Sequence, residues 1–132
     1  MDVDEQLSAP LAEASVAFAY LFGSRATGSE HAGSDLDLAI MPGRDLTLLD
    51  EQRLAARIAG AVNVPEVDLV RLDRAGLELR GKVVQEGRLA FSADEPRRVA
   101  FEVRTRAEYL DYLPTLRAHT HRYLRQVAER GL

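Results

Sequence analysis

Apolar and polar positions along the chain alternate between strand-like and helix-like patterns. The unbroken apolar run at 16–22 predicts a strand that is buried on both faces. In segment 34–41, leucines alternate with carboxylates, which is typical of a strand with one apolar and one polar face. We expect two further strands at 66–72 and 88–92. In the strand expected at 66–72, Asp68 should point away from its apolar neighbours.

Helical periodicity fills the segments between these strands. Thr47 and Asp50 have the spacing of a capping box, so a helix should begin there and end near Asn63. Its expected apolar stripe is Leu54, Ala55, Ile58, Ala61 and Val62. Other helices are expected at 77–85, 94–113 and 115–130. This order predicts an α/β or α+β fold in which helices pack against a sheet.

Two prolines are expected to disturb helices, because proline removes a backbone hydrogen-bond donor. Pro10 lies within an otherwise helical segment at 4–14, so we expect a short or broken opening helix. Pro114 should kink or interrupt the C-terminal helical segment, which spans about 94–130. The length of 132 residues fits a single domain covering 1–132.

Composition and charge narrow the class of protein. The chain has no cysteine, which excludes disulfides and cysteine-ligated zinc and fits a reducing cytoplasm. Its first twenty residues contain no Lys or Arg, so we expect no signal peptide, and the longest apolar run, 16–22, is too short to span a membrane. Residues 1–95 hold nine Lys and Arg against seventeen Asp and Glu, whereas 96–132 hold eight arginines against four acids. An acidic body argues against direct nucleic-acid binding.

The stretch between the first two strands carries the candidate chemistry. Gly23 and Ser24 follow the buried strand, and Asp35 and Asp37 are expected to project from one face of the next strand, with Cα atoms about 7 Å apart. Paired carboxylates repel each other, and a hard divalent cation such as Mg²⁺ relieves that repulsion. A phosphate-gripping turn followed by paired carboxylates therefore predicts a metal–nucleotide site. The P-loop alternative fails, because Ser29-Glu30 replaces its Lys-Ser/Thr.

These motifs resemble the signature of the polymerase-β-like nucleotidyltransferases, and in particular the minimal nucleotidyltransferase (MNT) proteins. The matching residues are Gly23-Ser24-Arg25-Ala26, then Gly28, then 34–38, SDLDL. The resemblance implies the polymerase-β-like fold, with a mixed sheet and helices packed against it. It also implies that Asp35, Asp37 and Asp68 hold two Mg²⁺ ions, that Asp68 orients or deprotonates the attacking hydroxyl, and that Gly23, Ser24 and Arg25 bind the nucleotide phosphates.

Many MNT proteins are antitoxins paired with HEPN toxins. By resemblance, this chain would use ATP as its substrate and transfer AMP to a tyrosine of a cognate HEPN ribonuclease toxin, with which it would form a hetero-oligomer. Tyr109 and Tyr112 share a face of the expected C-terminal helix and fit core or partner packing better than catalysis. His31, His119 and His121 are interpreted as surface residues.

Two other functions stay open at this point. The chain could neutralise a toxin by covering it, without chemistry. It could also modify a small molecule, although no second domain is evident that would hold such an acceptor. The sequence leaves undetermined the base preference, the number of AMP units, the acceptor residue and the stoichiometry.

Overall fold

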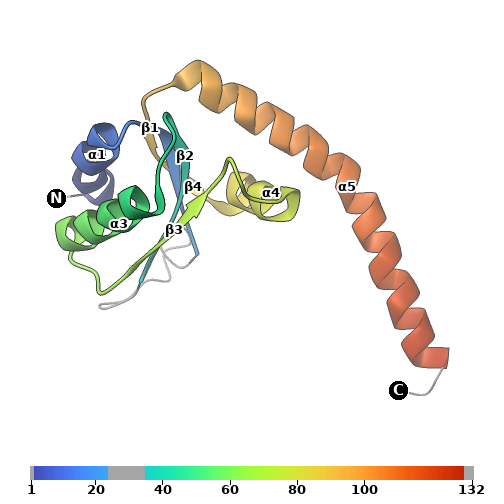
Figure 1. The fold of residues 1–132 in the computed structure, drawn as a ribbon. Coiled ribbons are helices and arrows are strands. Elements are labelled where there is room, and N and C mark those ends of the chain that lie inside the picture. The colour runs from blue at the N-terminus through green and yellow to red at the C-terminus, as the bar shows by residue number, and fades with distance from the viewer. Residues whose placement is uncertain (1, 24–34, 130–132) are drawn as a thin grey trace.

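The fold is a four-stranded mixed sheet with helices on both faces (Figure 1). The computed structural model describes residues 2–23 and 35–129, with side chains as far as 113. The elements in chain order are α1 (Val3–Glu13), β1 (Val16–Phe22), β2 (Leu36–Pro42), α3 (Leu48–Val62), β3 (Val67–Arg71), α4 (Leu77–Glu86), β4 (Arg88–Ser92) and α5 (Glu95–Glu129).

The strand order β3-β2-β1-β4 places the two most apolar strands at the centre of the sheet. Strand β1 pairs antiparallel with both β2 and β4, whereas β2 and β3 pair in parallel through the α3 crossover. The predicted mixed sheet is therefore confirmed. Because β1 is covered on both sides, its whole length is apolar, as the pattern at 16–22 predicts.

Each face of the sheet has its own core. One core lies under α1 and α3 and includes Leu11, Leu38 and Ile58. The other lies under α4 and α5 and includes Phe18 and Met41. Figure 1 shows these two pairs of helices on opposite sides of the sheet. Alternating residues of β2 therefore enter different cores.

Of the two proline predictions, the one for Pro10 needs correction, whereas for Pro114 a bend is observed and an interruption is not. Helix α1 continues through Pro10, which is buried, as are Leu7 and Leu11; burial of its apolar surface offsets the missing donor. Helix α5 is assigned as one helix across Pro114, so that proline does not interrupt it. The axis of α5 does change direction in its outer half (Figure 1), as a helix can when proline removes one bond and its neighbours continue the ladder.

The boundaries of α3 agree with the sequence prediction. The Thr47 hydroxyl accepts from the Asp50 backbone N–H at 3.1 Å, and the Asp50 carboxylate accepts from the Thr47 N–H at 2.9 Å. Asn63 ends the helix with φ of 62°, in the left-handed region that asparagine tolerates. Leu54 and Ile58 are buried as expected, but Ala61 is exposed, so the predicted apolar stripe was too wide at its end.

Candidate active site

Two of the predicted carboxylates lie side by side on adjacent strands. Asp37 of β2 is the direct register partner of Asp68 of β3. Paired residues of a parallel ladder point to the same face, and neighbouring strands are about 4.8 Å apart. Both carboxylates lie on the sheet face that α4 and α5 partly cover, because Leu36 and Leu38 enter the opposite core. The sequence prediction for Asp37 and Asp68 agrees with this placement.

Asp35 is placed differently from the expectation. Strand β2 begins at Leu36, so Asp35 precedes the strand and is exposed. A shared strand face for Asp35 and Asp37 is therefore not observed. Asp35 still acts on its neighbour, since its charge helps to raise the pKa of Asp37.

The surroundings of Asp37 disfavour its charged form. Partial burial raises the pKa of Asp37 above its ordinary value, and the negative charges of Asp68 and Asp35 raise it further. Each cause disfavours the charged form. A cation placed among these oxygens would oppose all three effects, so the donor set fits Mg²⁺, which prefers oxygen ligands.

The carboxylates of Asp35, Asp37 and Asp68 do not by themselves form a complete metal-binding site. Within 2–23 and 35–129, no group of three or more His, Cys, Asp or Glu side chains is arranged to hold a metal ion. The carboxylates are coupled electrostatically without converging on one point. Substrate phosphates and water commonly complete a magnesium site that proteins supply with only one or two carboxylates.

Gly23 brings the end of β1 against the carboxylates. Phe22 is the register partner of Asp37, and Gly23 follows with φ of +71°. A Cβ atom at Gly23 would clash with the Asp37 carboxylate. The left-handed conformation favours glycine here, and a larger residue would require the Asp37 carboxylate to move. Ser24, Arg25 and His31 lie outside the described residues.

A cavity that the sequence did not indicate opens beside Gly23. It has a volume of about 360 Å³ and is lined by Phe22, Gly23, Leu79, Lys82, Val83 and Glu86. Its walls join the end of β1 to α4, which are more than fifty residues apart in sequence. No motif links these segments, so the sequence carries no signal of this cavity.

The chain is similar in sequence to known proteins. The family model for polymerase beta, nucleotidyltransferase, matches residues 5–96. The protein adenylyltransferase MntA of Shewanella oneidensis is 33% identical over 90 residues, which cover 68% of this chain and 63% of that protein. The matched segment therefore spans less than two thirds of that relative.

Solved structures share the fold. A chain in the crystal structure of a toxin–antitoxin with AMP-PNP is 26% identical, with a TM-score of 0.75 over 92% of this chain and 98% of that chain. A chain of the toxin–antitoxin MntA-HepT has a TM-score of 0.69 at 23% identity, over 92% and 97% of the two chains, which shows likeness of fold. With the family model matching most of the chain around Gly23, Asp37 and Asp68, the protein belongs to the polymerase-β nucleotidyltransferase family.

Proposed function

We propose that the protein transfers AMP from ATP to a tyrosine hydroxyl of a partner protein, and that the partner is a HEPN ribonuclease toxin which the modification neutralises. The observation that carries this proposal is the register pairing of Asp37 with Asp68, beside a glycine that lies against Asp37. The relative named protein adenylyltransferase and the likeness to a toxin–antitoxin with AMP-PNP, an ATP analogue, support the nucleotide and the partner.

Asp35, Asp37 and Asp68 would hold two Mg²⁺ ions, and Gly23, Ser24 and Arg25 would bind the phosphates. Bound metal would neutralise the charge that develops on the triphosphate. The acceptor oxygen would form a bond to the α-phosphorus while the bond to pyrophosphate breaks. Asp68 is exposed at the open edge of the site, so it could accept the proton of the incoming hydroxyl. The cavity lined by Phe22 and Leu79 would receive the nucleobase.

The surface of α5 supports a protein partner. Val99, Val103 and Leu110 are 47%, 62% and 62% exposed, and their spacing places them on one side of the helix. Figure 1 shows α5 extending well beyond the sheet. An apolar stripe on a projecting helix is suited to packing against another helix. The two chains would then form a hetero-oligomer, in a cytoplasm with which the absence of cysteine is consistent.

The intact mass of the partner tests this function. The proposed HEPN-domain partner is incubated with the purified protein, Mg²⁺ and ATP. We expect its mass to rise by whole AMP units. Asp37→Asn and Asp68→Asn should each slow the transfer by at least about 100-fold, because charge stabilisation at the reacting phosphate is lost.

Asp45→Asn is the matched control, since Asp45 is exposed beyond the far end of β2 with a side chain 90% accessible. Circular dichroism should show that all three variants keep the fold. A tight complex whose mass never changes would contradict catalysis and indicate an antitoxin that acts by covering its partner. Full transfer by Asp37→Asn would refute the assigned role of this carboxylate.

A further inference from the structure

A second and larger cavity lies at the other end of the same sheet face. It has a volume of about 470 Å³ and is lined by Met41, Leu72, Asp73, Ala75, Arg80, Arg97, Ala100, Phe101, Arg104 and Thr105. Along β2, Met41 is four residues from Asp37, or about 13 Å at the rise of a strand. The cavity, which we call the arginine pocket, is therefore separate from the carboxylates of Asp37 and Asp68.

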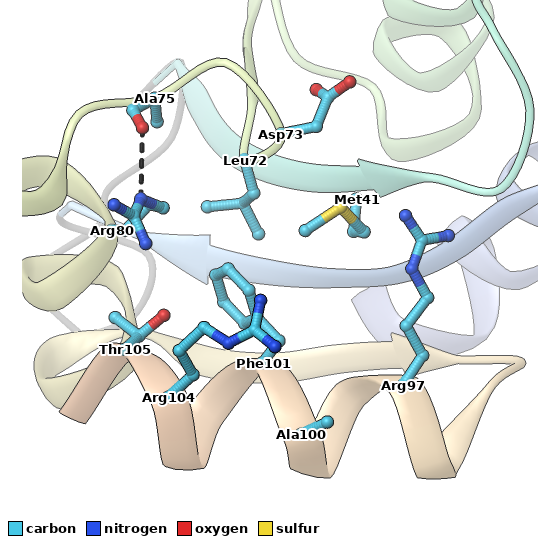
Figure 2. A pocket seen from close by; sticks show the side chains of 10 residues that line it. All are labelled: Met41, Leu72, Asp73, Ala75, Arg80, Arg97, Ala100, Phe101, Arg104 and Thr105. Carbon is cyan, nitrogen blue, oxygen red and sulfur yellow. Dashed lines mark hydrogen bonds between the residues drawn. The ribbon is translucent and has the colours of Figure 1, made fainter. Parts of the chain in front are cut away.

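The lining of the arginine pocket is strongly positive. It contains three arginines and a single carboxylate, that of Asp73. This carboxylate is already engaged by Arg71, which donates from Nη2 at 2.8 Å and from Nε at 3.1 Å. Figure 2 shows the Asp73 carboxylate pointing away from the arginines. It does not neutralise them.

Two of the three guanidinium groups have no acidic partner within the part of the chain that the structure describes. Arg97 donates from Nη1 to the carbonyl of Pro42 at 3.0 Å, which orients the group and leaves its charge in place. Arg104 makes no hydrogen bond or ion pair with a described residue. In Figure 2 both side chains rise from α5 toward the strands. The third, Arg80, donates to the carbonyl of Ala75 and lies 3.5 Å from Glu108.

A buried hydroxyl supplies an independent observation. Thr105 is fully buried in the lining of the same pocket, and its Oγ1 has no hydrogen-bond partner among the described residues. Buried polar atoms almost always have such a partner. The rest of the floor is apolar and is formed by Met41, Leu72 and Phe101. The pocket thus combines unsatisfied polar groups with apolar walls, which is the usual composition of a ligand site.

We propose that the arginine pocket binds a small phosphoryl-bearing molecule with a partly apolar body. Guanidinium groups match phosphate oxygens in geometry, and the charge-assisted hydrogen bonds they form are strong. The volume lies within the range of small-molecule sites. Arg97 and Arg104 hold the phosphoryl group, and Phe101 contacts the body of the ligand. This inference does not depend on AMP transfer, because the pocket lies outside the carboxylate site.

Backbone amide NMR with pyrophosphate and AMP as probes, in the absence of Mg²⁺, tests the pocket. We expect shifts at 72–75 and 97–105, and calorimetry should give a dissociation constant that rises by at least about tenfold in Arg97→Ala and in Arg104→Ala. Arg106→Ala is the matched control, since Arg106 is exposed on the same helix and does not line the pocket. Its dissociation constant should equal that of the unmodified protein.

Three results would overturn the proposal. Shifts confined to Gly23 and 36–37 would place the probes at the carboxylates. Equal weakening by Arg106→Ala would indicate general attraction to a basic helix. Failure of both probes to bind at millimolar concentration, or binding only of an acidic peptide from the partner, would exclude a small phosphoryl ligand. Since Arg104 is exposed and has no bond with another described residue, its alanine variant should fold, and the test does not require Arg97→Ala to do so.

Discussion

Asp37 is held in an electrostatic setting that opposes its own charge. Burial and the neighbouring carboxylates of Asp68 and Asp35 raise its pKa in the folded protein. The folded state therefore binds this proton more tightly than the unfolded state does. Stability is favoured below the unfolded pKa and decreases as pH rises through the window up to the raised folded pKa.

The variant Asp37→Asn should therefore raise the melting temperature at pH 7, because it removes the repelled charge and keeps the shape. At a pH well below the unfolded pKa, the two proteins should melt at more similar temperatures. Thermal unfolding without Mg²⁺ or nucleotide, followed by circular dichroism at both pH values, measures the difference. Asp45→Asn is the control for replacing a surface carboxylate by an amide. A lower melting temperature for Asp37→Asn at pH 7 would contradict the repulsion of Asp37 by its neighbouring carboxylates.

At the scale of single residues, the sequence predicted the groups that have a local signal. Asp37 was predicted from its alternation with leucines, and Asp68 was predicted from its position in the middle of an expected strand. The sequence did not show that β2 begins just after Asp35, because the alternation of apolar and polar residues does not show where pairing with β3 begins. Arg97 and Arg104 also did not indicate a pocket in the sequence, since Met41 of β2 and Leu72, which follows β3, share its lining but are far away along the chain.

The contact between α4 and α5 depends on one residue without a side chain. Gly81 is buried on α4, and a Cβ atom there would clash with the ring of Tyr109 on α5. We expect Gly81→Ala to lower the free energy of unfolding by about 1–3 kcal/mol, because the ring must move. Tyr109 is half-buried, as the sequence suggested for a packing residue.

Gly60 on α3 provides a matched comparison, because a Cβ atom there would meet nothing within 4 Å. Gly60→Ala should instead raise the free energy of unfolding by about 0.5–1 kcal/mol, through the lower backbone entropy of alanine in the unfolded chain. Urea denaturation measures both variants. A stabilised Gly81→Ala would show that α5 does not pack against α4 as described.

At the scale of elements, prediction succeeded where the determinant is local. The capping box at Thr47 and Asp50 and the left-handed Asn63 are short-range devices, and both ends of α3 followed from them. The effect of Pro10 was misjudged because the burial of its ring depends on the tertiary structure. For Pro114, the sequence allowed a kink or an interruption, and α5 continues through it with a change of axis direction.

The whole molecule divides its sheet into a sealed face and a partly open face. Helices α1 and α3 cover the first completely enough to bury Leu36, Leu38 and Ile40. On the second face, α4 and α5 leave the carboxylate site at one end of β2 and the arginine pocket at the other. The sheet order that creates this arrangement depends on long-range pairing, which local patterns of a single sequence do not specify.

The outward face of α5 leads to a prediction about assembly. Val103→Asp and Leu110→Asp place a charge on the exposed apolar stripe of α5 and should weaken binding of the proposed HEPN partner by at least about tenfold, as expected for residues at the centre of a helix interface. The melting temperature of the isolated protein should stay nearly constant, since both side chains are more than half exposed. Biolayer interferometry with the immobilised partner measures the affinity.

Leu48→Asp is the matched control for this prediction. Leu48 is 70% exposed at the start of α3, so its replacement makes the same chemical change away from the stripe. Its affinity for the partner should be unchanged, and aspartate is favourable in the first turn of a helix. If all three variants bound the partner equally well, the stripe would not be the docking surface, and the partner would have to approach through the carboxylate edge of the sheet alone.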